Sequence, residues 1–160
     1  MEIKIIEEND FEELHNMIAK TCRESFKIYY PKPYIEKTIE SLSVEALKNR
    51  ASWTNFYVVK IEGEIVGCGA IGAYWGSLTE SSLFTIFVDP DMQGKGIGKK
   101  IIETLEADDF AKRANRIEIP AGIVAIPFYK KMGYDFKNNE LVYENGHFAL
   151  EKFLKKVKGE

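Results

Sequence analysis

Apolar and polar positions alternate at the start of the chain and then change to helical spacing. Residues 3–5 alternate, which predicts a short first strand. Apolar residues then recur every three or four positions over 14–22, which predicts an amphipathic helix. We expect this helix to begin at Asp10, with Glu13 completing a capping box, and to reach Phe26. The N-terminal part of the chain is therefore predicted to open with a strand and a helix.

A break crowded with aromatic residues follows at 29–34, and a second helical stretch runs from there to about residue 50. Ser43, with Glu45 close behind it, predicts a separate short helix inside this stretch. Glu62-Gly63 joins two strand-like runs as a hairpin, and Asn145-Gly146 does the same near the end of the chain. The expected strands are 56–61, 65–75, 81–88, 116–119, 141–144 and 147–154, and the expected later helices are 96–114 and 123–132, the latter ended by Gly133.

The most informative segment is residues 83–101, where a strand, a glycine-rich loop and a helix follow one another. The run of β-branched and aromatic residues over 84–88 stops at Asp89-Pro90, and glycines then occupy positions 94, 96 and 98. Free backbone N–H groups and the positive end of the helix dipole would meet there, and glycine lets the backbone approach a ligand closely. The segment predicts a site for a phosphorylated cofactor.

Three kinds of glycine loop compete for this segment. A P-loop is excluded, because no glycine precedes a Gly-Lys-Ser/Thr at the required spacing. A dinucleotide fingerprint fits Gly94 and Gly96, but Lys99 occupies the third glycine position. Its acidic partner would have to be Glu118, which sits inside the strand 116–119 and not at its end. The third pattern, Q-x-x-G-x-G, is matched by Gln93 and by the glycines at 96 and 98.

Composition adds limits to this picture. The 160 residues are 45% hydrophobic and 29% charged, which is typical of one globular domain. A net charge of −3 gives no support for nucleic-acid binding. Neither a signal peptide nor a membrane-spanning run is expected. The separate Cys22 and Cys68 suggest reduced thiols in a cytoplasmic protein, and His15 and His147 are too far apart in sequence to suggest a zinc site.

Two further motifs follow the loop in order. Residues 125–134, AIPFYKKMGY, resemble the A-x-x-F-Y-x-K-x-G-F/Y motif of the GNAT superfamily, the Gcn5-related N-acyltransferases, and residues 147–152 resemble its last strand. The loop itself resembles the pyrophosphate-binding turn of that superfamily. The resemblance covers residues 82–154. It implies a single α/β (α+β) domain over residues 1–160, with a mixed, mostly antiparallel sheet of six to seven strands and about four helices.

The resemblance also implies acetyl-CoA as co-substrate, no metal, and direct transfer of the acetyl group to an amine. The residues implied to hold coenzyme A are Ile86, Phe87, Val88, Gln93, Gly94, Lys95, Gly96, Ile97, Gly98 and Lys99. The Val88 amide is implied to stabilise the oxyanion and Tyr129 to protonate the leaving thiolate, although spacing alone allows Tyr129 simply to pack in its helix. Ser82 stands where many relatives carry a glutamate base, so Glu80 is the candidate base. Gly122 replaces a usual asparagine.

The acceptor is implied to be a primary amine of a small molecule or peptide, bound by Tyr29, Tyr30, Tyr34 and Trp75. Aromatic rings together with acidic residues would suit a cationic amine. No nucleic-acid or membrane partner is expected, and the oligomeric state stays open, a homodimer included. Two alternatives also remain: a sensor or partner module that binds coenzyme A without catalysis, and a nicotinamide-dependent oxidoreductase.

Overall fold

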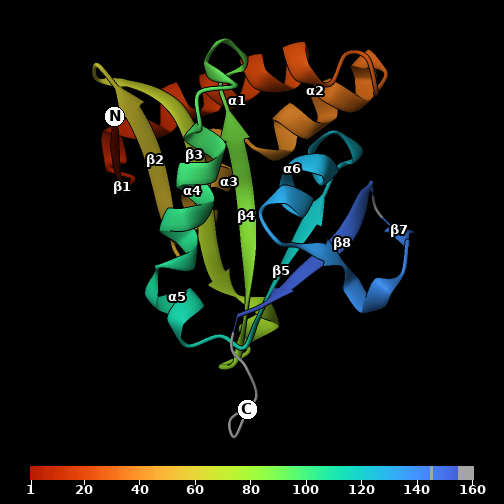
Figure 1. Cartoon of the computed structure of the whole chain (residues 1–160). Helices are drawn as coiled ribbons and strands as arrows, with labels where there is room; N and C mark the ends of the chain where they lie inside the picture. The colour runs from red at the N-terminus through yellow and green to blue at the C-terminus, as the bar shows by residue number, and fades with distance from the viewer. Residues whose placement is uncertain (145, 155–160) are drawn as a thin grey trace, which may run out of the picture. The chain divides into compact units, whose positions relative to one another are not determined.

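The computed structural model of the protein describes residues 1–144 and 146–154. This part of the chain forms eight strands and six α-helices (Figure 1). The strands are hydrogen-bonded in the order β1-β2-β3-β4-β5-β8-β6, and β7 pairs with β8. The β4–β5 pair is parallel, whereas β1–β2, β5–β8, β6–β8 and β7–β8 are antiparallel. The predicted α+β class is confirmed, with more strands and helices than expected.

The chain divides into two compact units by its internal contacts. The first comprises Met1–Ala70 and Thr85–Ile101, and the second comprises Ile71–Phe84 and Ile102–Glu160. Three elements contribute residues to both units, namely β3 (Glu64–Ala73), β4 (Glu80–Val88) and α4 (Ile97–Glu106).

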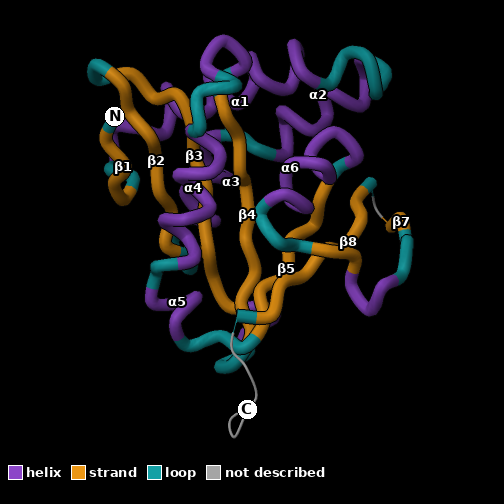
Figure 2. Tube along the Cα trace, viewed as in Figure 1, coloured by secondary structure: helices purple, strands orange, loops and turns teal. Residues whose placement is uncertain are grey.

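The first unit contains the predicted N-terminal strand and helices, which follow one another through short connections (Figure 2). Its α1 places Leu14, Ile18 and Cys22 in the core at the spacing of one helix face. Phe56 and Val58 alternate into the same core from β2, and each fully buried side chain of this size contributes about 1.5–3 kcal/mol. The bounds are β1 (Glu2–Ile5), α1 (Phe11–Ser25), α2 (Lys32–Ser41), α3 (Val44–Ala51) and β2 (Asn55–Ile61).

Two predicted signals at helix and strand ends are confirmed. Ser43 is the N-cap of α3, and its side chain accepts a hydrogen bond from the Ala46 amide at 3.2 Å. Glu62 and Gly63 both have positive φ, of 52° and 82°, between β2 and β3. This is the geometry of a type I′ hairpin turn, which confirms the predicted hairpin.

The predicted capping box of Asp10 and Glu13 is wrong. Asp10 Oδ2 instead accepts the Glu7 amide at 2.9 Å, and its Oδ1 pairs with Lys60 Nζ, also at 2.9 Å. Glu13 accepts the amide of Ile65 at the start of β3, at 2.8 Å. Both carboxylates therefore satisfy donors outside the first turn of α1, where a buried N–H needs a partner.

The second unit buries Leu105, Ile117, Tyr134 and Leu150, each at most 2% exposed. Alternate residues of β5 share this burial, because Ile119 and Ala121 are also buried whereas Glu118 and Pro120 are not. The bounds are α5 (Asp109–Lys112), β5 (Arg116–Ala121), α6 (Ile126–Lys131), β6 (Asp135–Phe136), β7 (Tyr143–Glu144) and β8 (His147–Phe153).

Two predicted boundaries differ from the structure, and a third is confirmed. The expected helix over 96–114 is interrupted, because Asp108 caps a new helix, α5, by accepting the Phe110 amide at 2.8 Å. The strand expected to reach Trp75 ends at Ala73, before a 3-10 turn. Gly133 has φ 97° just after α6, as predicted for a helix end. Asn145, half of the predicted second hairpin turn, lies outside the described residues.

Candidate functional site

The glycine loop leads directly from the end of β4 to the start of α4. Gly94 and Gly96 have φ of 79° and 81°, a backbone conformation that residues other than glycine rarely adopt. A Cβ at either position would meet no atom within 4 Å, so the space in front of the backbone is open. The two glycines are therefore required by backbone conformation, and they leave the loop surface accessible.

The amides at the start of α4 form the electropositive part of this loop. The Lys100 amide makes the first helical hydrogen bond, to Gly96 O at 3.1 Å. The amides of the first helical turn, at residues 97–99, consequently have no acceptor within the helix. Lys95 and Lys99 are exposed, whereas Ile97 is buried and anchors the turn. This arrangement can bind an anionic group such as a pyrophosphate.

The start of the loop is braced by side chains of the same unit. Lys20 of α1 pairs with Asp89 at 3.0 Å and with Asp91 at 2.7 Å, and these bonds raise the pKa of its ammonium. Gln93 Nε2 donates to Val88 O at 3.4 Å. The loop therefore holds its conformation through contacts to α1 and to the end of β4.

The last residues of β4 contain a local distortion that the sequence does not reveal. Thr85 has φ 55°, although β-branched residues strongly disfavour positive φ. Arg50 Nη1 donates to Thr85 Oγ1 at 3.0 Å, and Cys68 Sγ donates to Thr85 O at 3.1 Å. This distortion is thus held through the Thr85 side chain and through the Thr85 carbonyl. It directly precedes the half-buried residues 86–88 that are predicted to offer backbone groups to coenzyme A.

The parallel ladder between β4 and β5 is short. Its register runs from Glu80 opposite Arg116 to Ser82 opposite Glu118, while β4 continues to Val88. Ser82, which stands at the position where the resemblance implies a glutamate, is 4% exposed and donates to Leu83 O at 3.3 Å. Ser82 is therefore a buried strand residue and a poor candidate for moving a proton to solvent.

Tyr129, the predicted acid, lies on α6 in the second unit and is 5% exposed. Its ring makes edge contacts with Phe128 and Tyr134, at centroid distances of 5.3 Å and 6.2 Å. Tyr134 is fixed in turn, because its hydroxyl donates to Glu106 at 2.8 Å. These contacts pack the Tyr129 ring against two other aromatic side chains.

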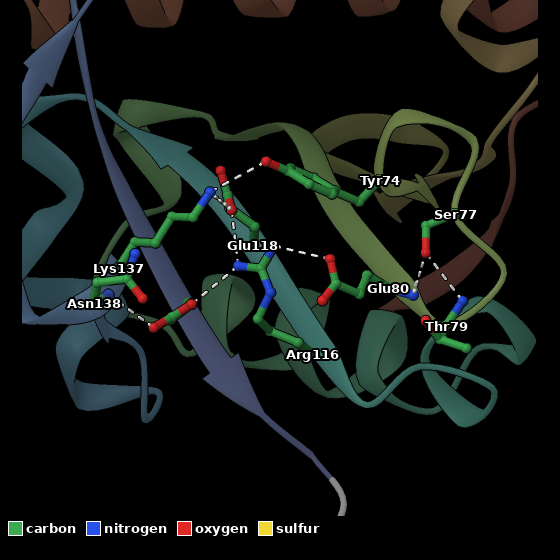
Figure 3. Close-up of polar contacts among 9 residues, drawn as sticks. Tyr74, Ser77, Thr79, Glu80, Arg116, Glu118, Lys137 and Asn138 are labelled. Carbon is green, nitrogen blue, oxygen red and sulfur yellow. Dashed lines mark hydrogen bonds and ion pairs between the residues drawn. The ribbon is translucent and has the colours of Figure 1, made fainter.

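Glu80, the predicted base, belongs to an ionic network on the β4–β5–β8 part of the second unit (Figure 3). Arg116 contacts Glu80 at 3.2 Å, Glu118 at 2.8 Å and Glu151 at 3.0 Å. Burial acts to lower the pKa of Arg116, but the carboxylates outweigh it and raise that pKa above its ordinary value. The Glu80 side chain is 37% exposed beside this buried cation.

Lys137 and Tyr74 extend this network. Lys137 Nζ pairs with Glu118 at 3.0 Å and donates to the Tyr74 hydroxyl at 3.2 Å (Figure 3). Those two hydrogen bonds raise the pKa of the Lys137 ammonium. The Arg116 guanidinium lies 4.9 Å from the Tyr74 ring centroid, so the ring sits against two cations. Sequence reasoning did not include Arg116 and Lys137, although the alternation of Arg116 and Glu118 along β5 places them on one face.

The predicted acceptor residues occupy two different settings. Tyr30 and Tyr34 stack at 4.5 Å, and Tyr30 lines a cavity of about 550 Å³ in the first unit. That cavity carries Arg23, Lys27 and Lys32 against Glu36, a basic lining that does not suit a cationic amine. Tyr29, which precedes Tyr30 in the sequence, is exposed to solvent. Trp75 belongs to the second unit and is 90% exposed.

Two other kinds of feature are absent from residues 1–144 and 146–154. In these residues no group of three His, Cys, Asp or Glu side chains could hold a metal ion. No helix formed by the same residues is long and apolar enough to cross a membrane. Cys22 and Cys68 are both buried free thiols, and burial raises the pKa of Cys22 to about 11.

Comparison with known proteins identifies relatives. A protein-family sequence model described as the acetyltransferase (GNAT) family matches residues 12–134. An uncharacterized N-acetyltransferase of Methanocaldococcus jannaschii is 31% identical over 144 residues, which cover 84% of this chain. The match spans 61% of that relative's own length.

Solved structures show the same fold at low sequence identity. The PaiA N-acetyltransferase from Thermoplasma acidophilum, crystallised with coenzyme A, has a TM-score of 0.83 at 20% identity, covering 96% of this chain and 98% of that chain. An aminoglycoside 6'-N-acetyltransferase, also complexed with coenzyme A, has a TM-score of 0.69 at 16% identity, covering 99% of this chain and 100% of that chain.

Proposed function

The chain belongs to the acetyltransferase (GNAT) family, and we propose that it transfers an acetyl group from acetyl-CoA to a primary amine of a small molecule or peptide. The observation that carries this proposal is the loop from Gln93 to Lys99. Its left-handed glycines leave an open backbone surface at the N-terminus of α4, which fits the pyrophosphate of coenzyme A. The two relatives crystallised with coenzyme A support the same ligand.

In the proposed reaction the new N–C bond forms as the C–S bond of the thioester breaks. Backbone groups of residues 86–88 hold the pantetheine arm, and the Val88 amide donates to the oxygen on which negative charge develops. Tyr129 donates a proton to the departing thiolate. Glu80 accepts the proton of the acceptor ammonium through water, so that the neutral amine can attack. No covalent bond to the protein forms.

The distorted end of β4 supports these backbone roles. A strand paired along its whole length would have no spare N–H groups to offer. The β4–β5 register covers Glu80–Ser82, and Thr85 adopts positive φ, so residues 86–88 follow a break in regular strand geometry. Residues 86–88 are the ones whose backbone N–H groups would have to be free to bind the pantetheine arm and the oxyanion.

The proposal is tested by placing a carboxylate in the loop. Gly96→Glu should reduce coenzyme A affinity by at least about 100-fold, because it puts negative charge beside the pyrophosphate and strains a residue with φ 81°. Gly63→Glu is the matched control, since Gly63 has φ 82° and equally open surroundings but lies in the β2–β3 turn. Calorimetry that finds equal affinities for the two variants would exclude the loop as the site.

A coenzyme A-binding module without catalysis is the second candidate, because Ser82 and Gly122 replace residues that are common in relatives. The two candidates differ in one measurement. Steady release of thiol from acetyl-CoA in the presence of an amine identifies the enzyme, whereas binding without release identifies the module.

A further inference from the structure

A second cavity, of about 470 Å³, lies entirely within the second unit. Its volume falls in the range of small-molecule sites, which is about 300–1,000 Å³. Glu118 and Pro120 of β5 contribute to its floor, and the β8 partner of Pro120 is Ala149, which also lines it. Directly paired residues point to the same side of a sheet, so the floor is the face of β5 and β8 opposite the buried Ile117 and Ile119.

The positive charges at this floor are already neutralised. Arg116 and Lys137 face three carboxylates, those of Glu80, Glu118 and Glu151 (Figure 3). Three carboxylates against two cations leave one net negative charge in a network whose Arg116 is only 8% exposed. A ligand entering this cavity therefore meets a negative potential in spite of the two basic residues.

Two glutamates at the rim of the cavity make its potential more negative. Glu140 and Glu144 line the cavity and are exposed, and no ion pair engages either side chain among the described residues. Two further carboxylates are thus available to a cationic ligand. The neighbouring Asn138 and Phe148 are uncharged.

Aromatic side chains form another part of the wall. Trp75 lines the cavity while 90% exposed, and its backbone is held at φ 47°, ψ 43°, a conformation rarely adopted by bulky residues. Strained residues of this kind concentrate at ligand-binding sites. Tyr74 contacts the Trp75 ring edge-on at 6.4 Å. The indole face offers a cation–π surface beside the carboxylates.

We propose that this cavity binds the amine acceptor, and that the acceptor carries a second cationic group, as in an aliphatic diamine or polyamine. The inference rests on the proposed acetyl transfer. The second ammonium lies between Trp75 and the carboxylates of Glu140 and Glu144, while the first remains free for acetylation. A monoamine of the same length lacks this contact, and an amino acid of the same length places a carboxylate against a negative wall.

The test compares diaminopentane, pentylamine and aminopentanoate in a thiol-release assay with acetyl-CoA. Diaminopentane should have at least about a tenfold higher kcat/KM than pentylamine, which corresponds to one additional desolvated cation contact. Aminopentanoate should be the poorest acceptor. Equal kcat/KM for diaminopentane and pentylamine would overturn the inference.

Substitutions of Glu140 and Glu144 test whether the preference for diaminopentane over pentylamine arises in this cavity. The double variant E140Q/E144Q should raise KM for diaminopentane about tenfold and raise KM for pentylamine much less, because pentylamine lacks the second ammonium. The matched control E12Q/E40Q removes the same two charges from exposed positions on α1 and α2 that line neither cavity. An identical KM for diaminopentane in the two double variants would exclude Glu140 and Glu144 from the site.

Failure of the acetyl transfer itself would look different. In that case no acceptor releases thiol, but calorimetry with diaminopentane alone still reports binding to the wild-type protein and weaker binding to E140Q/E144Q. Absence of diaminopentane binding to the wild type, in the presence and absence of coenzyme A, would remove the site whatever the loop binds.

Discussion

Thr85 concentrates backbone strain at the point where the proposed chemistry needs free amides. A β-branched residue at φ 55° costs about 1–3 kcal/mol and persists only where its surroundings hold it. Arg50 contributes to that hold, because its Nη1 donates a part-buried hydrogen bond to Thr85 Oγ1 at 3.0 Å. We infer that Arg50 and Thr85 position the backbone of residues 86–88.

Thr85→Val tests this positioning role. The variant keeps the β-branch and the volume but removes the oxygen that accepts from Arg50, so the strained Thr85 backbone loses one of its two restraints. We expect kcat to fall about tenfold, since small misplacements of catalytic groups are costly, with little change in coenzyme A affinity. Thr85→Ser retains the hydroxyl and should restore most of kcat. Equal kcat for the valine and serine variants would show that the hydroxyl has no positioning role.

Tyr129 gives a second prediction at this scale. Tyr129→Phe removes the proposed proton donor and keeps the ring that packs against Phe128 and Tyr134. Turnover should fall about 100-fold, within the range of general acid catalysis, while acetyl-CoA affinity changes less than about threefold. Normal turnover with an unchanged melting temperature would leave Tyr129 a packing residue only.

At the scale of elements, the pair of Asp10 and Lys60 ties the start of α1 to β2. The two side chains are 7% and 16% exposed, and their charged atoms lie 2.9 Å apart. Burial raises the pKa of Asp10, but the hydrogen bonds from Lys60 and from the Glu7 amide outweigh it, so the folded-state pKa lies below the ordinary value. The carboxylate therefore stabilises the fold in its ionised form.

The consequence is a pH-dependent stability difference. Because the folded pKa is depressed, the stabilisation is complete above the unfolded pKa of about 3.9 and is lost as pH falls through the folded pKa. Asp10→Asn should lower the free energy of unfolding by about 1–3 kcal/mol at pH 7. Urea unfolding at several pH values should show the wild type and the variant converging below about pH 4. A difference that persists undiminished at pH 3 would contradict this assignment.

The elements that sequence patterns predicted well are those governed by local interactions. The apolar period of α1, the Ser43 cap, the Glu62-Gly63 turn and the loop glycines each depend on residues a few positions apart. The break between α4 and α5 was missed because Asp108 could equally well have stayed on a helix surface. The positive φ of Thr85 has no sequence signal, since threonine is an ordinary strand residue.

The ionic network around Arg116 was not predicted, for a different reason. Arg116 meets Glu80 and Glu151 across separations of 36 and 35 residues, which only the strand order β4-β5-β8 brings together. Alternation along β5 placed Arg116 and Glu118 on one face but could not name their partners. Residue chemistry is therefore readable from the sequence, whereas long-range pairing needs the fold.

At the scale of the whole molecule, the choice among phosphorylated ligands becomes measurable as a shift in melting temperature. A ligand that binds only the folded chain adds about 2.7 kcal/mol of stability at one hundred times its Kd. For a chain of this size, 1 kcal/mol corresponds to about 2–4 °C, so saturating coenzyme A should raise Tm by about 5–10 °C.

NAD should leave Tm unchanged, because Lys99 replaces the third glycine of a dinucleotide fingerprint. The Gly96→Glu protein should lose the shift with coenzyme A, and Gly63→Glu should keep it. Protection by NAD without protection by coenzyme A would instead support a nicotinamide-dependent oxidoreductase, the alternative that the glycine loop alone left open.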